Sequence, residues 1–351
     1  MKKITAVILP DGKLGTVVGD VPELKENEVL IRVSASLISP GTEMNLARKR
    51  RENPDPDAGE ITFGYSNAGV IVQVKGDVKN LKVGMRVAAM GAGAAEHTNY
   101  AAVPVNLVVP IPDDVTFEQA AYLSLAATSL QAVRRTEPKL GEYGAVLGLG
   151  IVGNLAAQLY RLSGARVLGW ETIASRTEIA HRCGIPHVTD FMKMDAVSLS
   201  REFASPYGLD FALFAFGGNG EKAFDEVKKC MKVSADGHAM GRIVLVGGCR
   251  VPVDGGAASG NLDILASSRT GAGYHDRAWE YGRDYPPAFV QFTTQRNARE
   301  LIRLIAEKRL HVDPMTTHRI KLENVAEAGD LLIDHPDRAL GVILEMSRGD
   351  C

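Results

Sequence analysis

The feature that most constrains the fold is a glycine-rich turn near the middle of the chain. Residues 144–147 are a predicted buried strand and residues 154–163 a predicted helix, and Gly148, Gly150 and Gly153 join them in the pattern G-x-G-x-x-G. In the dinucleotide-binding fingerprint, the first glycine permits a tight turn and the second lets the backbone approach a pyrophosphate. The third lets the helix pack closely on the strand. The sequence therefore predicts a dinucleotide-binding strand–turn–helix.

Residues around this turn indicate which dinucleotide it would hold. The N–H groups of Ile151 and Val152 begin the helix without partners inside it, so they are predicted to bind phosphates. The next strand ends at Glu171, about 20 residues past the motif, where an acidic side chain binds ribose hydroxyls. A carboxylate there repels a 2′-phosphate, which favours NAD(H). Arg176 keeps NADP(H) open because a guanidinium binds phosphate. The alternative is a structural turn beside an incidental surface glutamate.

Strands and helices alternate after the turn. Helical stretches separate further apolar strands at residues 165–170, 209–216 and 242–247. Such alternation predicts an α/β fold, a doubly wound parallel sheet of the Rossmann type with helices on both faces. Strand ends in such a sheet face the ligand, so the predicted cofactor contacts include Phe216, Gly217 and Gly247.

The segments at the two ends of the chain have a different sequence pattern. Gly- and Pro-rich turns separate short β-like runs at residues 29–36, 69–75, 86–90 and 107–111. This pattern predicts an all-β opening, expected to form a barrel. Helical periodicity follows from residue 116 to 134, and a helix (298–308) and a strand (341–345) come near the end. We expect residues 1–123 and 274–351 to form a β-rich domain, with an α/β domain inserted at 124–273.

Composition excludes several classes of function. Forty Lys and Arg oppose 42 Asp and Glu in 351 residues, so the net charge of −2 attracts neither nucleic acid nor an anionic membrane. No apolar run approaches the roughly 18 residues of a membrane span, and the opening strand is too short for a secretory signal. A cytoplasmic protein acting on a small molecule is expected. The cysteines are too scattered for a zinc site or a disulfide framework: Cys183, Cys230, Cys249 and Cys351.

Several motifs together resemble those of the medium-chain dehydrogenase/reductase superfamily over essentially the whole chain. They are the glycine turn, Lys82–Val87 before a strand, Leu107–Asp113, and Gly241–Gly248. The resemblance implies a GroES-like catalytic domain with a nested Rossmann domain. Family habit also implies a homodimer or homotetramer.

The zinc motifs of that superfamily are altered here. Zinc-dependent members carry Cys-Gly-Thr-Asp and Gly-His-Glu, whereas this chain has Pro40-Gly41-Thr42-Glu43 and Gly64-Tyr65-Ser66. Proline and neutral serine do not replace the soft, deprotonated ligands of tetrahedral zinc. The lobe that normally holds a structural zinc is replaced by Met90–Ala95. Both zinc sites are expected to be absent. The altered motifs resemble a zinc-free branch with sugar or polyol dehydrogenase-like and bacteriochlorophyllide dehydrogenase-like members.

Without a metal, hydrogen-bond donors must stabilise developing alkoxide character. By the resemblance, Thr42 matches the hydroxyl that relays the proton in zinc enzymes; its alternative is a turn hydroxyl. Tyr65 stands where a ligating histidine would be, so its phenol is a candidate donor or acid/base; the alternative is a space-filling aromatic. Glu43 matches a family aspartate that braces the neighbouring loop.

Two histidines are further catalytic candidates because imidazole titrates near neutral pH. His97 lies at the edge of the shortened lobe, and His275 lies beside Asp276 in a segment that the resemblance brings towards the nicotinamide. For His97, a surface or hydrogen-bonded loop histidine is the alternative. For His275, the adjacent aspartate need not face the ring.

These observations favour a zinc-independent, NAD(H)-dependent oxidoreductase that interconverts a secondary alcohol of the sugar, polyol or cyclitol type and its ketone. Two alternatives remain open. One is an NADPH-dependent enoyl or quinone reductase of the same superfamily, and the other is a cofactor-binding protein without catalytic activity.

Overall fold

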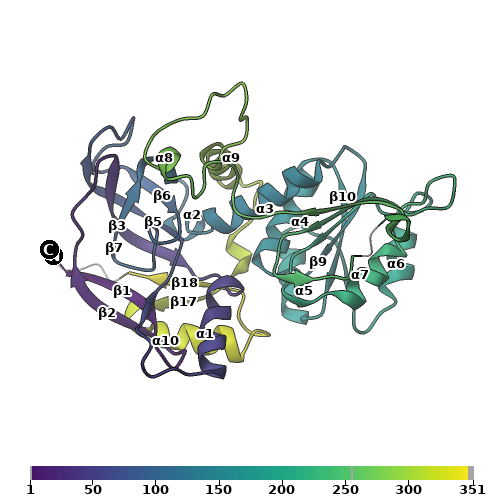
Figure 1. Cartoon of the computed structure of the whole chain (residues 1–351), viewed down its shortest axis with the longest axis horizontal. Helices are drawn as coiled ribbons and strands as arrows, with labels where there is room; N and C mark the ends of the chain where they lie inside the picture. The colour runs from purple at the N-terminus through teal and green to yellow at the C-terminus, as the bar shows by residue number, and fades with distance from the viewer. Residues whose placement is uncertain (1, 254–255, 347–351) are drawn as a thin grey trace. The chain divides into compact units, whose positions relative to one another are not determined.

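The computed structural model describes residues 2–253 and 256–346 (Figure 1). The chain divides into unit 1, Met1–Ala127 with Thr270–Cys351, and unit 2, Thr128–Arg269. The predicted inserted domain begins and ends four residues outside unit 2 (124 against 128, and 273 against 269). The free thiols described are those of Cys183, Cys230 and Cys249, and Cys351 lies outside the described residues.

Unit 2 is built on one parallel sheet (Figure 1). Its six strands lie in the order β11 (His187–Asp190), β10 (Arg166–Glu171), β9 (Tyr143–Leu147), β12 (Phe211–Phe214), β14 (Met240–Leu245), β16 (Asn261–Ala266). Numbered along the chain, this is the 3-2-1-4-5-6 order of dinucleotide-binding Rossmann sheets. The order reverses between β9 and β12, so the loops after these strands border the crevice where such sheets bind ligands. The predicted doubly wound fold is confirmed.

Helices cover both faces of this sheet. On β12, Phe211 packs against Tyr160 of α4 (Ile151–Leu162), with ring centroids 4.5 Å apart. Phe214 is an odd number of residues further along the strand, so it points to the other face, into a buried cluster shared with α7 (Glu221–Lys228). The remaining helices of this part of the chain are α3 (Leu123–Thr136), α5 (Ala174–Arg182) and α6 (Ala196–Phe203).

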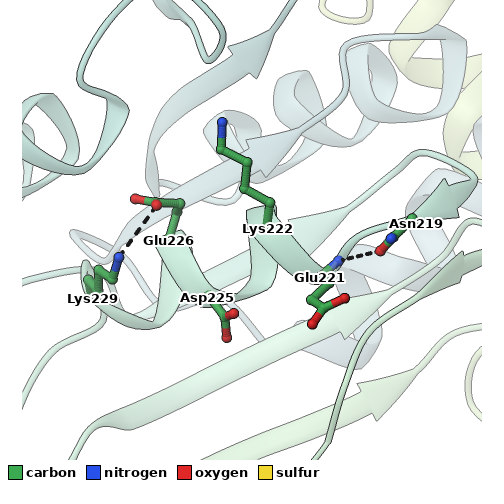
Figure 2. A pocket seen from close by; sticks show the side chains of 6 residues that line it. All are labelled: Asn219, Glu221, Lys222, Asp225, Glu226 and Lys229. Atoms are coloured by element: carbon green, nitrogen blue, oxygen red, sulfur yellow. Dashed lines mark hydrogen bonds and ion pairs between the residues drawn. The ribbon is translucent and has the colours of Figure 1, made fainter.

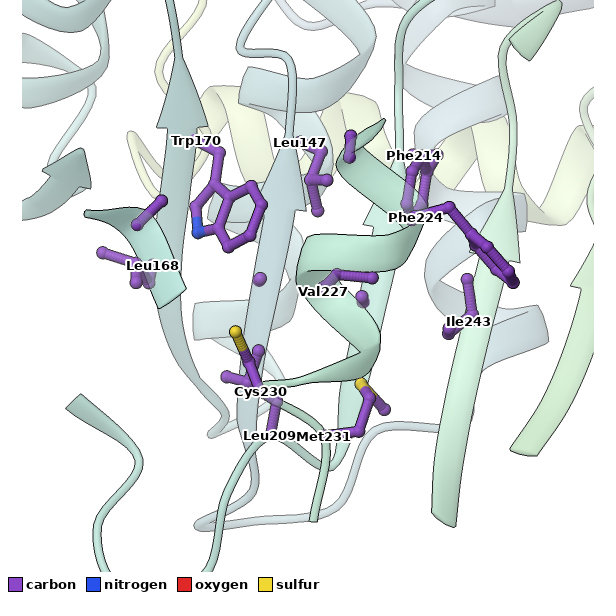
Figure 3. Packing of buried hydrophobic residues seen from close by; sticks show 14 of the residues in the cluster. Leu147, Leu168, Trp170, Leu209, Phe214, Phe224, Val227, Cys230, Met231 and Ile243 are labelled. Atoms are coloured by element: carbon purple, nitrogen blue, oxygen red, sulfur yellow. The ribbon is translucent and has the colours of Figure 1, made fainter. Parts of the chain in front are cut away.

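The α7 helix is amphipathic. Its charged face lines an open surface pocket, in which Lys229 pairs with Glu226 (Figure 2). Its other face presents Phe224 and Val227 to the sheet, where they pack beside Trp170 and the neighbouring strand residues (Figure 3). Burial of this apolar face holds the helix on the sheet, and the opposite face is solvated.

Unit 1 contains two sheets. One joins β17 (Thr316–Lys321), β18 (Gly341–Glu345), β3 (Glu28–Leu37), β5 (Ser66–Lys75), β6 (Arg86–Met90) and β8 (Val108–Pro110), with β7 (Tyr100–Pro104) also paired to β3. The other joins β2 (Leu14–Asp20), β1 (Lys2–Ile8) and β4 (Ile61–Thr62). The five predicted strands are confirmed, with bounds that differ by at most three residues. A bridge between Thr5 and Thr98 joins the two sheets. Among the described residues no further pairing closes them into a ring, so the strands of the predicted barrel form two bridged, open sheets.

The predicted all-β opening is wrong, because α1 (Thr42–Glu52) lies within it. The segment has no β-branched residue after Thr42, and its Leu, Ala, Lys, Arg and Glu residues favour a helix. Met44 and Ala47 are buried, and Arg51 pairs with Asp330 and Asp334 of α10 (Val325–Asp334). Charged residues at one end of this segment obscured its helical period. The other helices of unit 1 are α2 (Phe117–Ala120), α8 (Arg277–Glu280), α9 (Thr294–Ala306) and α10 (Val325–Asp334). No helix in the described ranges is long and apolar enough to cross a membrane.

Candidate active site

The glycine turn has the geometry that the motif predicts. Gly148 has a φ of +85°, a left-handed conformation that an L side chain strains to adopt. Gly150 faces open space: a Cβ there would have no heavy atom within 4 Å. At Gly153 a Cβ would overlap the carbonyl oxygen of Gly148, so only glycine lets α4 lie this close to the turn. The turn is therefore an open cradle at the end of β9, and it fits the pyrophosphate of a dinucleotide.

The first turn of α4 offers donors to an anion. Gly150 is its N-cap residue and has no side chain to bond the helix N–H groups. Ile151 is buried and Val152 is half-buried, and the Val152 carbonyl is fixed by the Ser129 hydroxyl at 2.9 Å. A helix start left uncapped by side chains binds a phosphate with its amides and its dipole.

Glu171 ends β10 and is 4% exposed. Its Oε2 accepts from the Leu149 N–H at 2.7 Å, and its Oε1 accepts from Thr172 N–H at 2.7 Å and Ile173 N–H at 3.0 Å. A carboxylate has about four acceptor positions, so these three bonds leave one for a ribose hydroxyl. Glu171 therefore ties β10 to the glycine turn as well as lying at the predicted ribose position.

Arg176 lies in the first turn of α5, the helix that follows β10. Burial lowers the pKa of its guanidinium, and the nearby Glu171 carboxylate opposes that shift. The acidic and basic candidates for ribose recognition thus lie close enough to interact. The loops after β12 and β14 also approach one another: a Cβ at Gly247 would overlap the carbonyl oxygen of Phe216, whereas Gly217 is exposed with open space around it.

In unit 1, Tyr65 lies among hydroxyl groups. The Ser39 and Thr42 side chains both act on the pKa of its phenol. Burial raises the pKa of Tyr65 strongly, the Glu43 carboxylate adds to the rise, and the two hydroxyls oppose it. Tyr274 makes a further small contribution in the raising direction. Tyr65 is therefore a neutral phenol at physiological pH, a form with a hydrogen to donate. Thr42, the first residue of α1, is exposed, and Ser39 is buried.

Glu43 is buried, with 5% of its surface exposed. Its Oε2 accepts from the Ser39 N–H at 2.7 Å and lies 3.2 Å from Nε2 of His97. Among the described residues, its other oxygen, Oε1, is buried without a hydrogen-bond partner. The loop-bracing role predicted from the family aspartate agrees with the Ser39 contact, but the contact with His97 and the bare oxygen go beyond it.

His97 is fully buried rather than at a loop surface. Its Nδ1 lies 2.8 Å from the Ser36 hydroxyl, its Nε2 contacts Glu43, and its ring meets Phe63 edge-on at 4.9 Å. Both ring nitrogens are thus engaged. A substrate does not reach this imidazole, so His97 acts, if at all, through Glu43.

His275 is exposed, with a φ of +68°. The neighbouring Asp276 does not orient it: that carboxylate caps α8 through Ala278 N–H and accepts from the Tyr285 hydroxyl. Tyr274 is the residue of this segment that joins the cluster, since it influences Tyr65 and its hydroxyl accepts from Ala92 N–H at 3.2 Å. The sequence reasoning missed Tyr274, Ser36 and Ser39 as cluster members. The only signal for Tyr274 was its place in the flagged segment.

The residues at the zinc-motif positions do not fit a zinc ion. Ser66 uses its hydroxyl to donate to the Ala121 carbonyl at 2.6 Å and to accept from Ser124 N–H at 3.2 Å. Pro40 offers no donor atom, and Tyr65 is a neutral phenol. In the described part of the chain, no three His, Cys, Asp or Glu side chains gather as metal ligands.

The amino-acid sequence of this chain is similar to those of known oxidoreductases. Residues 25–113 match the family model described as the alcohol dehydrogenase GroES-like domain. An NADPH-dependent alkenal/one oxidoreductase of Arabidopsis thaliana chloroplasts is 32% identical over 195 residues, which cover 52% of this chain and 50% of that protein. The D-xylulose reductase of Saccharomyces cerevisiae is 22% identical, with 95% of each chain covered. The chain thus spans about half the length of the first relative and nearly all of the second.

A solved structure extends the likeness to the whole fold. An Escherichia coli oxidoreductase/dehydrogenase of unknown specificity superposes with a TM-score of 0.81 at 20% identity, covering 99% of this chain and all of that one. The GroES-like match lies in unit 1, and the segment that forms the Rossmann sheet of unit 2 is inserted in the chain between the two segments of unit 1. The chain belongs to the medium-chain dehydrogenase/reductase superfamily.

Proposed function

We propose that this protein is an oxidoreductase that uses NAD(H) to interconvert a secondary alcohol and its ketone without zinc. The glycine turn supports dinucleotide binding because it leaves open space at Gly150 and uncapped amides at the start of α4. The observation that carries the zinc-free chemistry is the neutral, half-buried Tyr65 phenol at a zinc-ligand position. The D-xylulose reductase relative supports a sugar or polyol substrate.

The proposed chemistry requires transfer of a hydride and of a proton. A bound nicotinamide supplies or accepts the hydride. Tyr65 donates its phenolic hydrogen to the substrate oxygen, where negative charge develops, and the Ser39 and Thr42 hydroxyls lower the pKa of that phenol. Thr42 is exposed, so its hydroxyl is accessible to solvent protons.

The preference for NAD(H) rests on Glu171. Its carboxylate keeps one acceptor position beyond its three backbone bonds, and its charge disfavours a 2′-phosphate. The Arg176 guanidinium instead favours the 2′-phosphate of NADP(H). Fluorescence titration of the two reduced cofactors tests this proposal, with tighter binding of NADH expected. Tighter binding of NADPH would reverse the assignment.

A second candidate is NADPH-dependent reduction of an activated carbon–carbon double bond. The 32% identity with the Arabidopsis alkenal/one oxidoreductase, and Arg176 beside the ribose position, favour it. Parallel assays with polyols, their ketones and enones decide between the two activities. Turnover restricted to enones with NADPH would replace the first candidate.

One experiment tests the core of the proposal. Titration of the purified chain with NADH and NADPH should quench intrinsic fluorescence and raise the melting temperature. Metal analysis of the same sample should find no stoichiometric zinc. Binding of neither cofactor, or one zinc per chain, would contradict the proposal.

A further inference from the structure

A chain of buried hydrogen bonds links a central strand of unit 1 to the loop that precedes α1. On β3, the Ser36 hydroxyl lies 2.8 Å from Nδ1 of His97. Nε2 of His97 lies 3.2 Å from Oε2 of Glu43, and the same oxygen accepts from the Ser39 N–H at 2.7 Å. All four residues are at most 5% exposed. The imidazole thus connects a strand at one ring nitrogen with the start of a helix at the other.

The strand end of this chain is fixed by the sheet. At the position of Ser36, β3 pairs with β5 on one side and with β18 on the other. The backbone of His97 is bonded as well: its N–H donates to the Phe63 carbonyl at 3.2 Å, and its carbonyl accepts from the Ala6 N–H at 2.8 Å. The ring of His97 also meets the Phe63 ring edge-on. The imidazole is therefore held in place independently of its contact with α1.

The loop at the other end, residues 39–41, is closed by the Glu43 carboxylate. Pro40 has no N–H to donate, and Gly41, the N-cap residue of α1, has no side chain to bond the first helical N–H groups. The bond between the Ser39 N–H and Glu43 spans this loop. Because Oε1 of Glu43 has no hydrogen-bond partner in the described ranges, the two contacts of Oε2 alone orient the carboxylate.

The partners of His97 indicate which ring nitrogen carries hydrogen. An ionised carboxylate accepts hydrogen bonds and does not donate them, so Nε2 is expected to donate to Glu43. The Ser36 hydroxyl can both donate and accept, so it suits Nδ1 whether or not that nitrogen carries hydrogen. The serine thus supports the ring orientation in which the imidazole bonds the carboxylate.

We infer that His97 is a positioning residue, which orients the Glu43 carboxylate so that the loop 39–41 holds the Thr42 hydroxyl in a fixed place. Thr42 follows this loop directly as the first residue of α1, and its side chain is exposed. The effect on turnover rests on the proposed function, in which the Thr42 hydroxyl takes part. His97 is fully buried and acts through these contacts, without touching the substrate.

The tautomer of His97 is measurable without activity. Long-range ¹H–¹⁵N NMR of the cofactor-free protein distinguishes a ring nitrogen that carries hydrogen from one that does not, and the spectrum of His97→Gln assigns the signals. Hydrogen should be found on Nε2. A neutral ring with hydrogen on Nδ1 alone would overturn the inference, because the ring would then have no donor for Glu43.

Two substitutions at position 97 separate positioning from packing. The amide of glutamine reaches about as far as Nε2 of histidine, so His97→Gln keeps a donor for Glu43. The amide of asparagine reaches only about as far as Nδ1, so His97→Asn keeps the contact with Ser36 and loses the contact with Glu43. Both variants lose the ring that packs on Phe63. A histidine needed only for packing would therefore give equal losses in the two variants.

Hydrogen exchange of the Ser39 N–H reports directly on the loop. This buried amide should exchange slowly in the unsubstituted protein and in His97→Gln. In His97→Asn it should exchange about tenfold faster relative to the amides of β3, since the carboxylate that accepts from it loses one of its two contacts. Equal exchange in the three proteins would overturn the inference.

Two further variants serve as a second test and a control. Ser36→Ala leaves position 97 unchanged and removes the contact with the strand, so it should speed exchange of the Ser39 N–H about threefold. An unchanged rate in Ser36→Ala would contradict the inference without depending on how well His97→Asn folds. His318 lies half-buried on β17 of the same unit, and His318→Asn should leave the exchange of this amide unaffected.

Turnover should follow the same order. With a ketone and reduced nicotinamide, kcat should fall about tenfold in His97→Asn and at most about threefold in His97→Gln, with the KM for cofactor unchanged in both. Equal kcat values in the two active variants would overturn the inference alone. Absence of any nicotinamide-dependent turnover in the unsubstituted protein would overturn the proposed function, and the NMR and exchange experiments would still decide whether His97 positions the loop.

Discussion

Two buried glutamates, one in each unit, differ in how the fold treats them. Glu171 is 4% exposed and both its oxygens accept backbone N–H groups, three in all. Glu43 is 5% exposed and has one oxygen engaged and the other bare within the described chain. The first carboxylate is satisfied by its own loop, so it holds the cofactor turn together. The second is left incompletely satisfied, as expected of a group that serves chemistry.

The largest expected effect is a loss of folding stability when the Glu171 carboxylate is removed. Glu171→Ala removes the acceptor of three N–H groups that the fold buries around the end of β10. We expect the free energy of unfolding to fall by about 3 kcal/mol, because bonds to a charged group are lost and buried donors are left unpaired. Denaturant unfolding measures the change. A loss below about 1 kcal/mol would show that the loop does not depend on this carboxylate.

Tyr65→Phe tests the unit 1 side of the comparison. It removes the phenolic hydroxyl, whose pKa Ser39 and Thr42 lower, and keeps the ring. We expect kcat for carbonyl reduction to fall about 100-fold, the lower range for loss of a general acid, while cofactor affinity is unchanged. Steady-state kinetics with a saturating ketone provides the measurement.

His275→Ala is the control for Tyr65→Phe, because His275 is exposed and its neighbour Asp276 is committed to α8. It should leave kcat nearly unchanged. Equal losses in the two variants would place the acid elsewhere.

Arg176→Ala tests which side chain near Glu171 reads the ribose. The guanidinium is the positive group beside that carboxylate, and a phosphate would pair with it. We expect binding of NADPH to weaken about tenfold, a loss of about 1.4 kcal/mol, with little change for NADH. Titration of both cofactors gives the ratio. If NADH binding weakens equally, Arg176 supports the loop and does not discriminate between the cofactors.

The sequence predicted the unit 2 site more fully than the unit 1 cluster, for a physical reason. The motif glycines, Ile151 and Val152 are contiguous, and their roles follow from backbone geometry that a short segment specifies by itself. Glu171 follows from strand spacing alone. The fold was predictable for the same reason, since the alternation of strands and helices is a local pattern repeated along the chain.

The unit 1 cluster depends on tertiary contacts that no local pattern reveals. Tyr65 and Thr42 were found through motif positions, but His97 meets Glu43 across 54 residues of sequence. Tyr274 comes from the far end of the chain, after all of unit 2. A surface histidine and a buried, hydrogen-bonded one have the same local sequence signal, so the sequence left both open as alternatives to catalysis, and the structure shows the hydrogen-bonded one.

The smallest expected effect compares the same substitution at the two glutamates. Glutamine has one carbonyl oxygen, so at position 171 it must turn an NH₂ group towards N–H donors that both carboxylate oxygens now serve. At position 43 that single oxygen can keep the bonds to Ser39 N–H and His97, and the NH₂ group takes the place of the bare Oε1. Glu171→Gln should therefore reduce the free energy of unfolding by about 1 kcal/mol more than Glu43→Gln does. Equal losses in parallel denaturant titrations would mean that the bare oxygen of Glu43 is satisfied in solution, and the distinction between the two carboxylates would then fail.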